Sequence, residues 1–329
     1  MKILLTGATG FLGYRTLEKL IEQAEIEKII ATGRTLKKSH QIDHPKVEYR
    51  LGDLVNREFV DGIVKEVDHI IHAAALSSPW GKYKEFEDAN LRSQINLINA
   101  IKRNKLVKYI YISTPSMYFD STNRRGIKEN DPLPRKFINA YSSTKRMAEI
   151  ELINSGIPYV ILRPRALTGR GDTVIMPRII NAFKEGKLKI IGNGKNIVDL
   201  TSVANAADAI LLSLKAEGAA LNQIYNITNG EPVNLWEKIG LVLNLMDKQL
   251  PQKKIPYFIV LSIAQLFEWK SKLTNMKEPA LTKYGVGVLS KSMTLDISKA
   301  RELLGYHPTV TTDEAITEFV NWYAENEKN

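Results

Sequence analysis

Short, uniformly apolar runs alternate with longer amphipathic stretches along the first half of the chain. The runs are predicted as strands at Lys2–Leu5, Lys28–Thr32, Val47–Leu51, His69–His72, Tyr109–Ser113 and Pro158–Arg163, with a further strand near Ile224–Ile227. Most of them lack the polar alternation of a half-exposed antiparallel strand, which favours a parallel sheet covered on both faces. The pattern therefore predicts an α/β fold with a doubly wound parallel sheet.

The stretches between the strands have the periodicity of helices. Helices are predicted at Tyr14–Gln23, Asn90–Asn104 and Tyr141–Asn154. The last of these is followed by Gly156 and Pro158, which are the usual signals for the end of a helix.

After about Gly169 the alternation gives way to turn-rich pieces between helices. We predict that residues 1–168 form the sheet domain, with the sheet completed by about residues 198–230. Residues 169–197 and 231–329 are then mainly a smaller, mostly helical C-terminal cap, and Glu325–Asn329 are expected to be a frayed tail.

The amino-acid composition is typical of a globular protein with a packed core. The 329 residues are 44% hydrophobic, which is ample for a packed core, and they include no cysteine, which excludes disulfides and thiolate metal sites. No metal is expected. The net charge of +10 is spread over short groups such as Lys37–Lys38, Arg124–Arg125 and Lys253–Lys254 without interleaved aromatic residues. A nucleic-acid partner is therefore not expected, and a small-molecule ligand is.

The sequence contains no strong signal for export or for a transmembrane helix. The apolar run at the N-terminus is too short for a signal peptide, so a cytoplasmic protein is expected. The most apolar segment, Ile255–Phe267, is shorter than the ~20 residues that cross a bilayer. A buried helix is the first interpretation of this segment, and a helix facing lipid or a greasy substrate is the second, which keeps peripheral membrane contact open.

A glycine-rich turn joins the first strand to the first helix. It reads Gly7-Ala8-Thr9-Gly10-Phe11-Leu12-Gly13. Glycines at such a junction permit a tight turn, let backbone N–H groups approach a pyrophosphate and allow close packing, while the helix N-terminus attracts negative charge. The position of the turn predicts that residues 7 and 9–13 bind a dinucleotide.

The end of the second strand indicates which dinucleotide. An acidic residue there binds the ribose hydroxyls of NAD, whereas Arg34 stands at this place and suits the 2′-phosphate of NADP. NADP is therefore preferred over NAD as the expected cofactor. Asp53 and Leu54 after the third strand, and Ala73–Ala75 after the fourth, are further candidate contacts to the cofactor.

Tyr141 and Lys145 are spaced so that both side chains share one face of a helix. This spacing is common by chance and carries little information alone. The motifs around the Tyr141–Lys145 pair make the spacing informative. A glycine turn and Ser113-Thr114 precede the pair, and Arg163-Pro164 follows it, each at the end of a predicted strand, which is the order expected in a βαβ chain.

With these motifs the sequence resembles the extended short-chain dehydrogenase/reductase superfamily, and in Gly169-Arg-Gly-Asp172 its 3β-hydroxysteroid dehydrogenase-like branch. The resemblance implies a Rossmann-like NAD(P)-binding domain over residues 1–168 and a substrate cap. It implies Tyr141 as general acid/base, Lys145 as a ribose-binding residue that lowers the phenol's pKa, and Thr114, with Ser113 as the fallback, as the residue that holds the substrate oxygen. Pro164 is implied as a cofactor contact, and the helices Asn90–Asn104 and Tyr141–Asn154 as a homodimer interface.

This chain departs from the superfamily's sequence patterns at two places, and these departures indicate which of the superfamily's reactions it catalyses. Dehydratases carry Asp-Glu directly after the threonine, where this chain has Pro115-Ser116, and sugar-nucleotide enzymes carry an asparagine where it has Ala166. We therefore predict an oxidoreductase that interconverts a ketone and a secondary alcohol on a hydrophobic or lipid-like substrate of the steroid or β-keto acid type. Candidate substrate residues are Trp80, Ser116, Arg165 and Arg178. A nucleotide-sugar epimerase or reductase and a non-catalytic NADP-binding sensor remain the alternatives.

Overall fold

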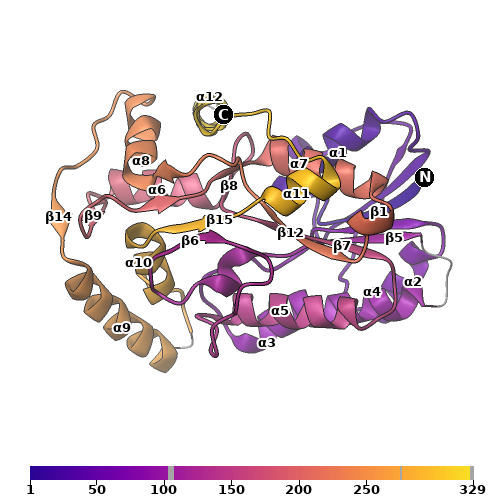
Figure 1. The fold of residues 1–329 in the computed structure, drawn as a ribbon, viewed down its shortest axis with the longest axis horizontal. Helices are drawn as coiled ribbons and strands as arrows, with labels where there is room; N and C mark the ends of the chain where they lie inside the picture. Colours follow the sequence, from indigo (N-terminus) through magenta and orange to yellow (C-terminus); the bar gives the residue numbers. More distant parts are fainter. Residues whose placement is uncertain (103–106, 275, 327–329) are drawn as a thin grey trace.

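A parallel sheet forms the centre of the larger part of the molecule (Figure 1). The computed structural model describes residues 1–102, 107–274 and 276–326. The sheet has seven strands in the order β12-β7-β5-β4-β1-β2-β3, and neighbouring strands pair in parallel. Its strands are β1 (Lys2–Thr6), β2 (Lys28–Thr32), β3 (Val47–Tyr49), β4 (His69–His72), β5 (Lys108–Ile112), β7 (Tyr159–Pro164) and β12 (Gln223–Ile227).

Successive side chains of each strand enter two different cores. Ile3 and Leu5 of β1 pack into one core, whereas Leu4 between them packs into the other. Helices α1 (Phe11–Ile21), α7 (Val203–Lys215) and α11 (Ser298–Leu304) cover the first face of the sheet, and α2 (Arg57–Val64), α4 (Ser93–Ile101) and α5 (Ala140–Ile153) cover the second (Figure 1). The doubly wound α/β fold predicted from uniformly apolar strands is confirmed.

The predicted strands all exist, with ends displaced by two residues or fewer. Helix α1 begins at Phe11, three positions before the predicted start, because the helix follows the glycine turn directly. The predicted helix Asn90–Asn104 begins as the π-helical turn Glu87–Arg92 and continues as α4, while residues 103 and 104 lie outside the described residues.

The second part of the molecule combines helices with small sheets. Its helices are α6 (Ile175–Lys184), α8 (Leu235–Asn244), α9 (Tyr257–Leu273), α10 (Lys283–Ser290) and α12 (Thr312–Asn326), and α3 (Tyr83–Phe86) lies in the first part. The short strands are β6 (Arg124–Ile127), β8 (Leu167–Thr168), β9 (Ile190–Ile191), β10 (Ile197–Val198), β11 (Thr201–Ser202), β13 (Val233–Asn234), β14 (Lys254–Ile255) and β15 (Met293–Leu295).

Two expectations for the C-terminal half were wrong. Glu325 and Asn326 belong to α12 and are not a frayed tail, since the buried Phe319 and Val320 anchor that helix; residues 327–329 lie outside the described residues. The apolar segment Ile255–Phe267 is not a buried helix either. It forms most of α9, which lies at the edge of the molecule with several large apolar side chains exposed (Figure 1).

Candidate active site

The carboxyl ends of β1, β4, β5 and β7 meet at one edge of the sheet, because these strands are parallel neighbours. Ligands of open α/β sheets bind at this edge. Residues predicted for the site follow each strand there: Gly7 after β1, Ala73 after β4, Thr114 after β5, and Pro164 at the end of β7.

The glycine turn packs too closely for any side chain. Gly7 has φ +73°, and a Cβ atom on it would lie 2.7 Å from the backbone nitrogen of Ala74. A Cβ atom on Gly13 would lie 1.9 Å from the carbonyl oxygen of Gly7. Ala73 and Ala74 are held against this turn, since their backbone N–H groups donate to the Thr6 carbonyl and to Thr6 Oγ1 at 3.2 Å each.

Helix α1 presents a bare N-terminus at this turn. Gly10 precedes the helix and contributes no side-chain cap, so the first backbone N–H groups, which follow Thr9 and Gly10 at Phe11 and Leu12, are left for a ligand. An anion is stabilised at such a helix end by the N–H groups and by the helix dipole. The close-packed turn and the uncapped helix fit the pyrophosphate of a dinucleotide.

Arg34 lies beside the glycine turn. A Cβ atom on the preceding Gly33 would lie 2.3 Å from Thr9 Oγ1, so the end of β2 is in contact with the turn. The Arg34 side chain is exposed and forms no ion pair within residues 1–102, 107–274 and 276–326. His40, which the sequence did not single out, is a further basic side chain here, with its ring 3.1 Å from the Thr9 carbonyl and stacked on Tyr14.

Asp53 and Leu54 lie on the next loop along this edge. The Gly52 N–H donates to the Gly33 carbonyl at 3.0 Å, which joins the loop to the end of β2. Asp53 is exposed and its carboxylate accepts from the Val55 N–H at 3.0 Å, whereas the Leu54 side chain is buried. Of the two, Asp53 is therefore the one whose side chain can reach a ligand.

Hydroxyl groups gather around the Tyr141 phenol at the end of β5. The side chains of Ser77 and Thr114 are close enough to the phenol to lower its pKa, and Thr114 Oγ1 lies 2.7 Å from Ser116 Oγ. Asn139 holds Tyr141 in place, because its side chain accepts from the Ser142 N–H at 2.9 Å and so caps α5. Thr114 thus reaches the phenol, whereas the Ser113 hydroxyl lies beside Glu149.

Lys145 lies one helical turn after Tyr141 on α5. Its ammonium is buried, donates to the Ile112 carbonyl at 2.6 Å and lies 4.0 Å from the centre of the Tyr111 ring. Burial lowers the pKa of Lys145 to about 7, although the Glu149 carboxylate opposes this. Lys145 therefore carries only part of its charge at neutral pH when no ligand is bound.

The pKa of Tyr141 moves opposite to the prediction. Burial raises the pKa of the phenol above its ordinary value of 10, and the nearby side chains of Ser77 and Thr114 only partly offset this. Lys145 was expected to lower it. Its ammonium instead contacts the Ile112 carbonyl and is itself partly neutral, so the ligand-free site keeps Tyr141 protonated.

A buried ion pair supports the catalytic helix from below. The Glu149 carboxylate on α5 accepts from Arg163 Nε at 2.8 Å and from the Arg163 terminal nitrogen at 2.6 Å, and both side chains are fully buried. Arg163 also donates to the Tyr118 hydroxyl, which itself lies 3.3 Å from Asn226. This network joins α5 to β7 and to β12.

Comparison with known proteins identifies the family. The model of the NAD dependent epimerase/dehydratase family matches residues 3–228. The chain belongs to this family. It is an NAD(P)-dependent oxidoreductase of the short-chain dehydrogenase/reductase type, which confirms the resemblance drawn from the motifs.

Relatives of this epimerase/dehydratase family member carry several names. The chain is 29% identical to a 2-alkyl-3-oxoalkanoate reductase of Shewanella oneidensis, over 95% of this chain and 84% of the relative. It is 28% identical to the decarboxylating sterol-4-alpha-carboxylate 3-dehydrogenase of Mus musculus, over 96% and 89%. The structure is similar, with a TM-score of 0.78 and 23% identity over 99% of both chains, to UDP-glucuronic acid 4-epimerase from Bacillus cereus in complex with NAD, which supports the fold.

The cap contributes a second aromatic residue to the epimerase/dehydratase site. Tyr284 of α10 is close enough to Tyr141 to raise the pKa of its phenol and packs edge-on against Phe119 at 5.6 Å. Sequence reasoning missed both Ser77 and Tyr284, because no local motif marks them. Trp80, which was predicted, lies on the loop of Ser77, partly buried.

The two predicted arginines differ in their surroundings. Arg165 directly follows β7 and is buried, and its Nε has no hydrogen-bond partner among the described residues. Its charge lowers the pKa of the buried Asp199, although burial outweighs this and raises the pKa of that carboxyl to about 6. Arg178 is exposed and forms an ion pair with Glu278 at 3.0 Å, so it does not face the site as an available cation.

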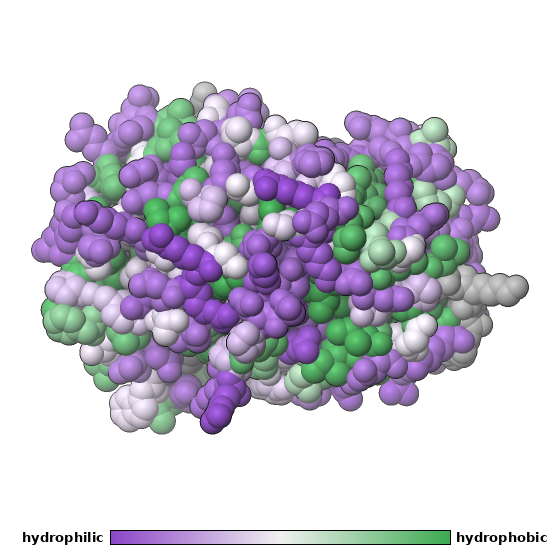
Figure 2. All heavy atoms as spheres, viewed as in Figure 1, coloured by the Kyte–Doolittle hydropathy of each residue, from purple (hydrophilic) through white to green (hydrophobic). Residues whose placement is uncertain are grey.

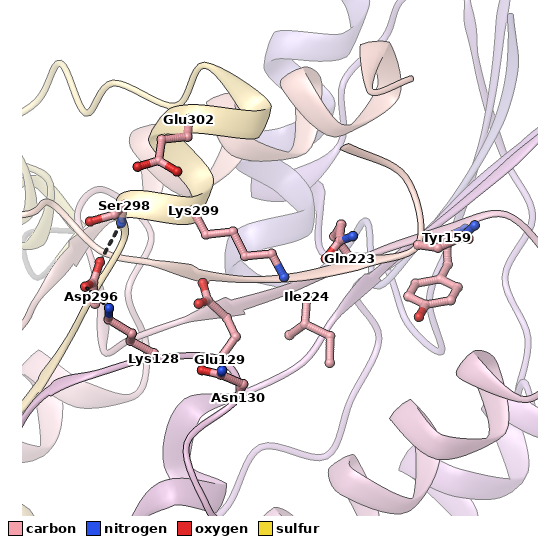
Figure 3. A pocket seen from close by; sticks show the side chains of 11 residues that line it. Lys128, Glu129, Asn130, Tyr159, Gln223, Ile224, Asp296, Ser298, Lys299 and Glu302 are labelled. Atoms are coloured by element: carbon pink, nitrogen blue, oxygen red, sulfur yellow. Dashed lines mark hydrogen bonds and ion pairs between the residues drawn. The ribbon is translucent and has the colours of Figure 1, made fainter. Parts of the chain in front are cut away.

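A cavity of about 620 Å³ lies away from this site (Figure 3). Charged side chains, among them Glu129 and Lys299, line it, together with Tyr159 and Gln223, the first residues of β7 and β12. Because the catalytic residues lie at the opposite, carboxyl ends of the strands, this cavity does not belong to the active site.

Proposed function

We propose that the protein is an NADP(H)-preferring reductase that interconverts a hydrophobic β-keto acid and the corresponding β-hydroxy acid. The observation that carries this proposal is the Tyr141 phenol at the carboxyl edge of the sheet, beside the hydroxyl side chains of Thr114 and Ser77. Such a group of hydroxyls binds and protonates one carbonyl oxygen.

The chemistry of the step is divided between the cofactor and the chain. The nicotinamide supplies or accepts the hydride when it is bound. Thr114 and Ser77 hold the substrate oxygen, and Tyr141 donates its proton to that oxygen during reduction. Because the pKa of Tyr141 is raised, the phenol keeps its proton at neutral pH and can donate it to the substrate oxygen during reduction. Lys145, one turn away, would bind the ribose of the cofactor.

Two positions disfavour the alternatives within the family. Pro115 and Ser116 follow Thr114, and Ser116 is occupied with the Thr114 hydroxyl, so the acid and base that water elimination needs are not at this place. Ala166 has φ +44°, a conformation that asparagine adopts more readily than alanine. The backbone here thus suits the asparagine of sugar-nucleotide enzymes, but the amide group is missing.

The substrate class follows from the buried cation and from the relatives' names. A 2-alkyl-3-oxoalkanoate and a sterol-4-carboxylate with oxygen at carbon 3 both carry a carboxylate on the carbon next to the reacting one. We assign Arg165 as the partner of this carboxylate, because a buried guanidinium with a free Nε gains strongly from a negatively charged ligand. Apolar groups of the substrate would then lie against Trp80 and the cap.

The preference for NADP rests on the charge beside the glycine turn. Arg34 is exposed and unpaired in the described structure, and the short helical turn Lys38–His40 adds further basic groups on the same side. A 2′-phosphate carries about two negative charges, and an arginine binds it with charge-assisted hydrogen bonds.

The decisive experiment compares substrates with wild type and Tyr141→Phe. We expect oxidation of NADPH by the wild type with 2-alkyl-3-oxoalkanoates and 3-keto-sterol-4-carboxylates, and no net turnover of UDP-glucuronic acid. Removal of the proton donor should lower kcat by roughly 10²–10⁴ while NADPH binding, measured by fluorescence, is unchanged.

Each other result has a definite meaning. Interconversion of UDP-sugars seen by NMR without net NADPH oxidation would assign an epimerase. NADPH binding without turnover of any carbonyl in the panel would assign a sensor. Full activity of Tyr141→Phe would refute the assigned mechanism.

A further inference from the structure

Helix α9 has its apolar face outward. The residues that it buries against the molecule are Val260, Ala264, Glu268 and Ser271. Its exposed large residues are Phe258, Ile259, Ile263, Leu266, Phe267, Trp269 and Leu273. At 100° per residue the exposed set covers one continuous half of the helix surface. In Figure 2 hydrophobic atoms are visible at the lower left edge, where α9 lies.

Polar contacts on the inner face fix this orientation. Glu268 accepts a hydrogen bond from the Lys283 N–H at 2.7 Å and forms an ion pair with the Lys283 ammonium at 3.3 Å. Ser271 donates to the Lys277 carbonyl. A rotation of α9 that hid its apolar face would break these contacts and expose Val260 and Ala264 instead.

Several apolar side chains of α9 are more than half exposed to solvent. The side chains of Phe258 and Leu273 are 67% exposed, that of Trp269 is 62% exposed and that of Leu266 is 59% exposed. Contiguous apolar surface of this kind marks an interaction site in most proteins. None of these residues belongs to the site described above, so the surface needs a partner of its own.

The charge along α9 and its flanks is mostly positive, and the exposed acid that follows, Glu278, is paired with Arg178. Residues 251–277 contain the lysines Lys253, Lys254, Lys270, Lys272 and Lys277, and the single acid of this segment, Glu268, faces inward. All of these lysines are exposed, and none forms an ion pair in the part of the chain that the structure describes. The apolar face is therefore bordered by unneutralised positive charge.

We infer that α9 docks the protein on an anionic lipid surface. The apolar and aromatic side chains enter the boundary between headgroups and acyl chains, and the lysines contact the negative headgroups. No helix among the described residues is long and apolar enough to cross a membrane, so the contact is in the plane of the interface. A second copy of the chain fits this face less well, because a twofold contact would bring the lysines of both copies together.

The docked helix is part of the substrate cap. Helix α9 packs against α10, which carries Tyr284 beside the catalytic phenol. Docking therefore places the cap side of the molecule at the lipid surface. The inference rests on the surface of α9 alone and holds whichever carbonyl compound the enzyme reduces.

Vesicle binding by the full-length protein tests the inference. Flotation is measured with vesicles of phosphatidylcholine alone and of phosphatidylcholine mixed with phosphatidylglycerol. We expect binding to the mixed vesicles that falls as salt is added, because exposed charges are screened. The combined variant Leu266→Gln, Trp269→Gln, Leu273→Gln should lower the partition coefficient by roughly tenfold or more, since each side chain loses its apolar burial.

Matched control variants distinguish docking through α9 from misfolding and from non-specific hydrophobic binding to vesicles. Leu245→Gln changes an apolar residue that is 41% exposed outside α9 and should leave the partition unchanged. All variants should bind NADPH like the wild type. Emission of the exposed Trp269 should shift to shorter wavelength on binding, and Trp269→Phe should remove the shift but keep the binding.

Three outcomes overturn the inference. They are no binding to either vesicle, equal binding by the wild type and the combined variant, and self-association in solution that the combined variant abolishes. The last outcome would assign the face to a second copy.

Discussion

Lys145 shows how burial controls the charge of a side chain in the candidate site. Its ammonium has lost water and gained the Ile112 carbonyl and the Tyr111 ring, and its pKa falls to about 7. A lysine in an unfolded chain stays protonated up to about pH 10.4. Between these two values the unfolded chain binds one proton more than the folded chain, so this residue makes stability rise with pH.

We predict that Lys145→Met stabilises the ligand-free protein at low pH. Below about pH 7 the wild type must bury a charged ammonium, and the free energy of unfolding of the variant should be higher by on the order of a few kcal/mol. The difference should shrink as the pH rises toward about 10. Urea unfolding across this range measures it, and the exposed Lys102→Met serves as control. A difference that does not vary with pH would contradict the lowered pKa.

Arg34 carries the prediction for cofactor selection. In Arg34→Ala we expect the Kd for NADPH to rise by roughly tenfold to a hundredfold, because a charge-assisted contact to the 2′-phosphate is lost. The Kd for NADH should change little. Calorimetry or fluorescence titration with both cofactors measures this, with the exposed Arg135→Ala as the matched control. Equal losses for the two cofactors would remove Arg34 from the phosphate site.

The candidate site residues that sequence alone marks are those with a local constraint. Gly7 and Gly13 are constrained by the turn they form, and Tyr141 and Lys145 by one turn of helix, so each leaves a pattern in the sequence. Ser77 and Tyr284 reach the phenol only through packing of separate elements and leave none. The direction of the Tyr141 pKa was missed for the same reason, since burial is a property of the whole fold.

At the scale of elements, the hydrophobic periodicity predicted whether a segment is a helix or a strand better than it predicted whether that segment is buried. The uniformly apolar strands were found because both faces of the sheet are covered. Helix α9 has the same apolar content as a buried helix, and its pattern does not reveal that the apolar side faces solvent. The short strands β8 to β11 and β13 to β15 escaped prediction because two or three residues carry no period.

Helix α5 gives a prediction for assembly. Met147 and Ile150 lie three residues apart on its outer face and are 39% and 40% exposed, and the Tyr83 hydroxyl lies 3.5 Å from the Met147 sulfur. We predict a homodimer through this face and α4. Met147→Glu with Ile150→Glu should convert the dimer to a monomer in sedimentation velocity, because charges would be buried in the interface.

The control for assembly is Leu303→Glu, which changes a residue of similar exposure, 39%, on α11. It should sediment like the wild type. A wild-type protein that sediments as a monomer at all concentrations tested would contradict the predicted interface.

At the scale of the molecule, the chain crosses between its two parts more than once. After β7 it enters the cap, and it returns for α7 and β12 and again for α11, which packs on the first face of the sheet beside β12. The sequence predicted the return near residues 198–230 but not the return of α11, since a seven-residue helix has too few positions to show which core it joins.

The Arg163–Glu149 pair has a consequence for substrate selection. It ties α5, which carries Tyr141, the proposed proton donor, to β7, which is followed by Arg165, the proposed partner of the substrate carboxylate. Removing Glu149 would leave the Arg163 charge buried without a carboxylate, and removing Arg163 would leave Glu149 with only its partly exposed partner Arg146 at 2.9 Å. A shift of one element against the other therefore carries a cost. The separation between Tyr141 and Arg165 is therefore rigid. With the role proposed for Arg165, the site would hold the carbonyl and the carboxylate of its substrate at one separation and would tolerate variation elsewhere in the substrate.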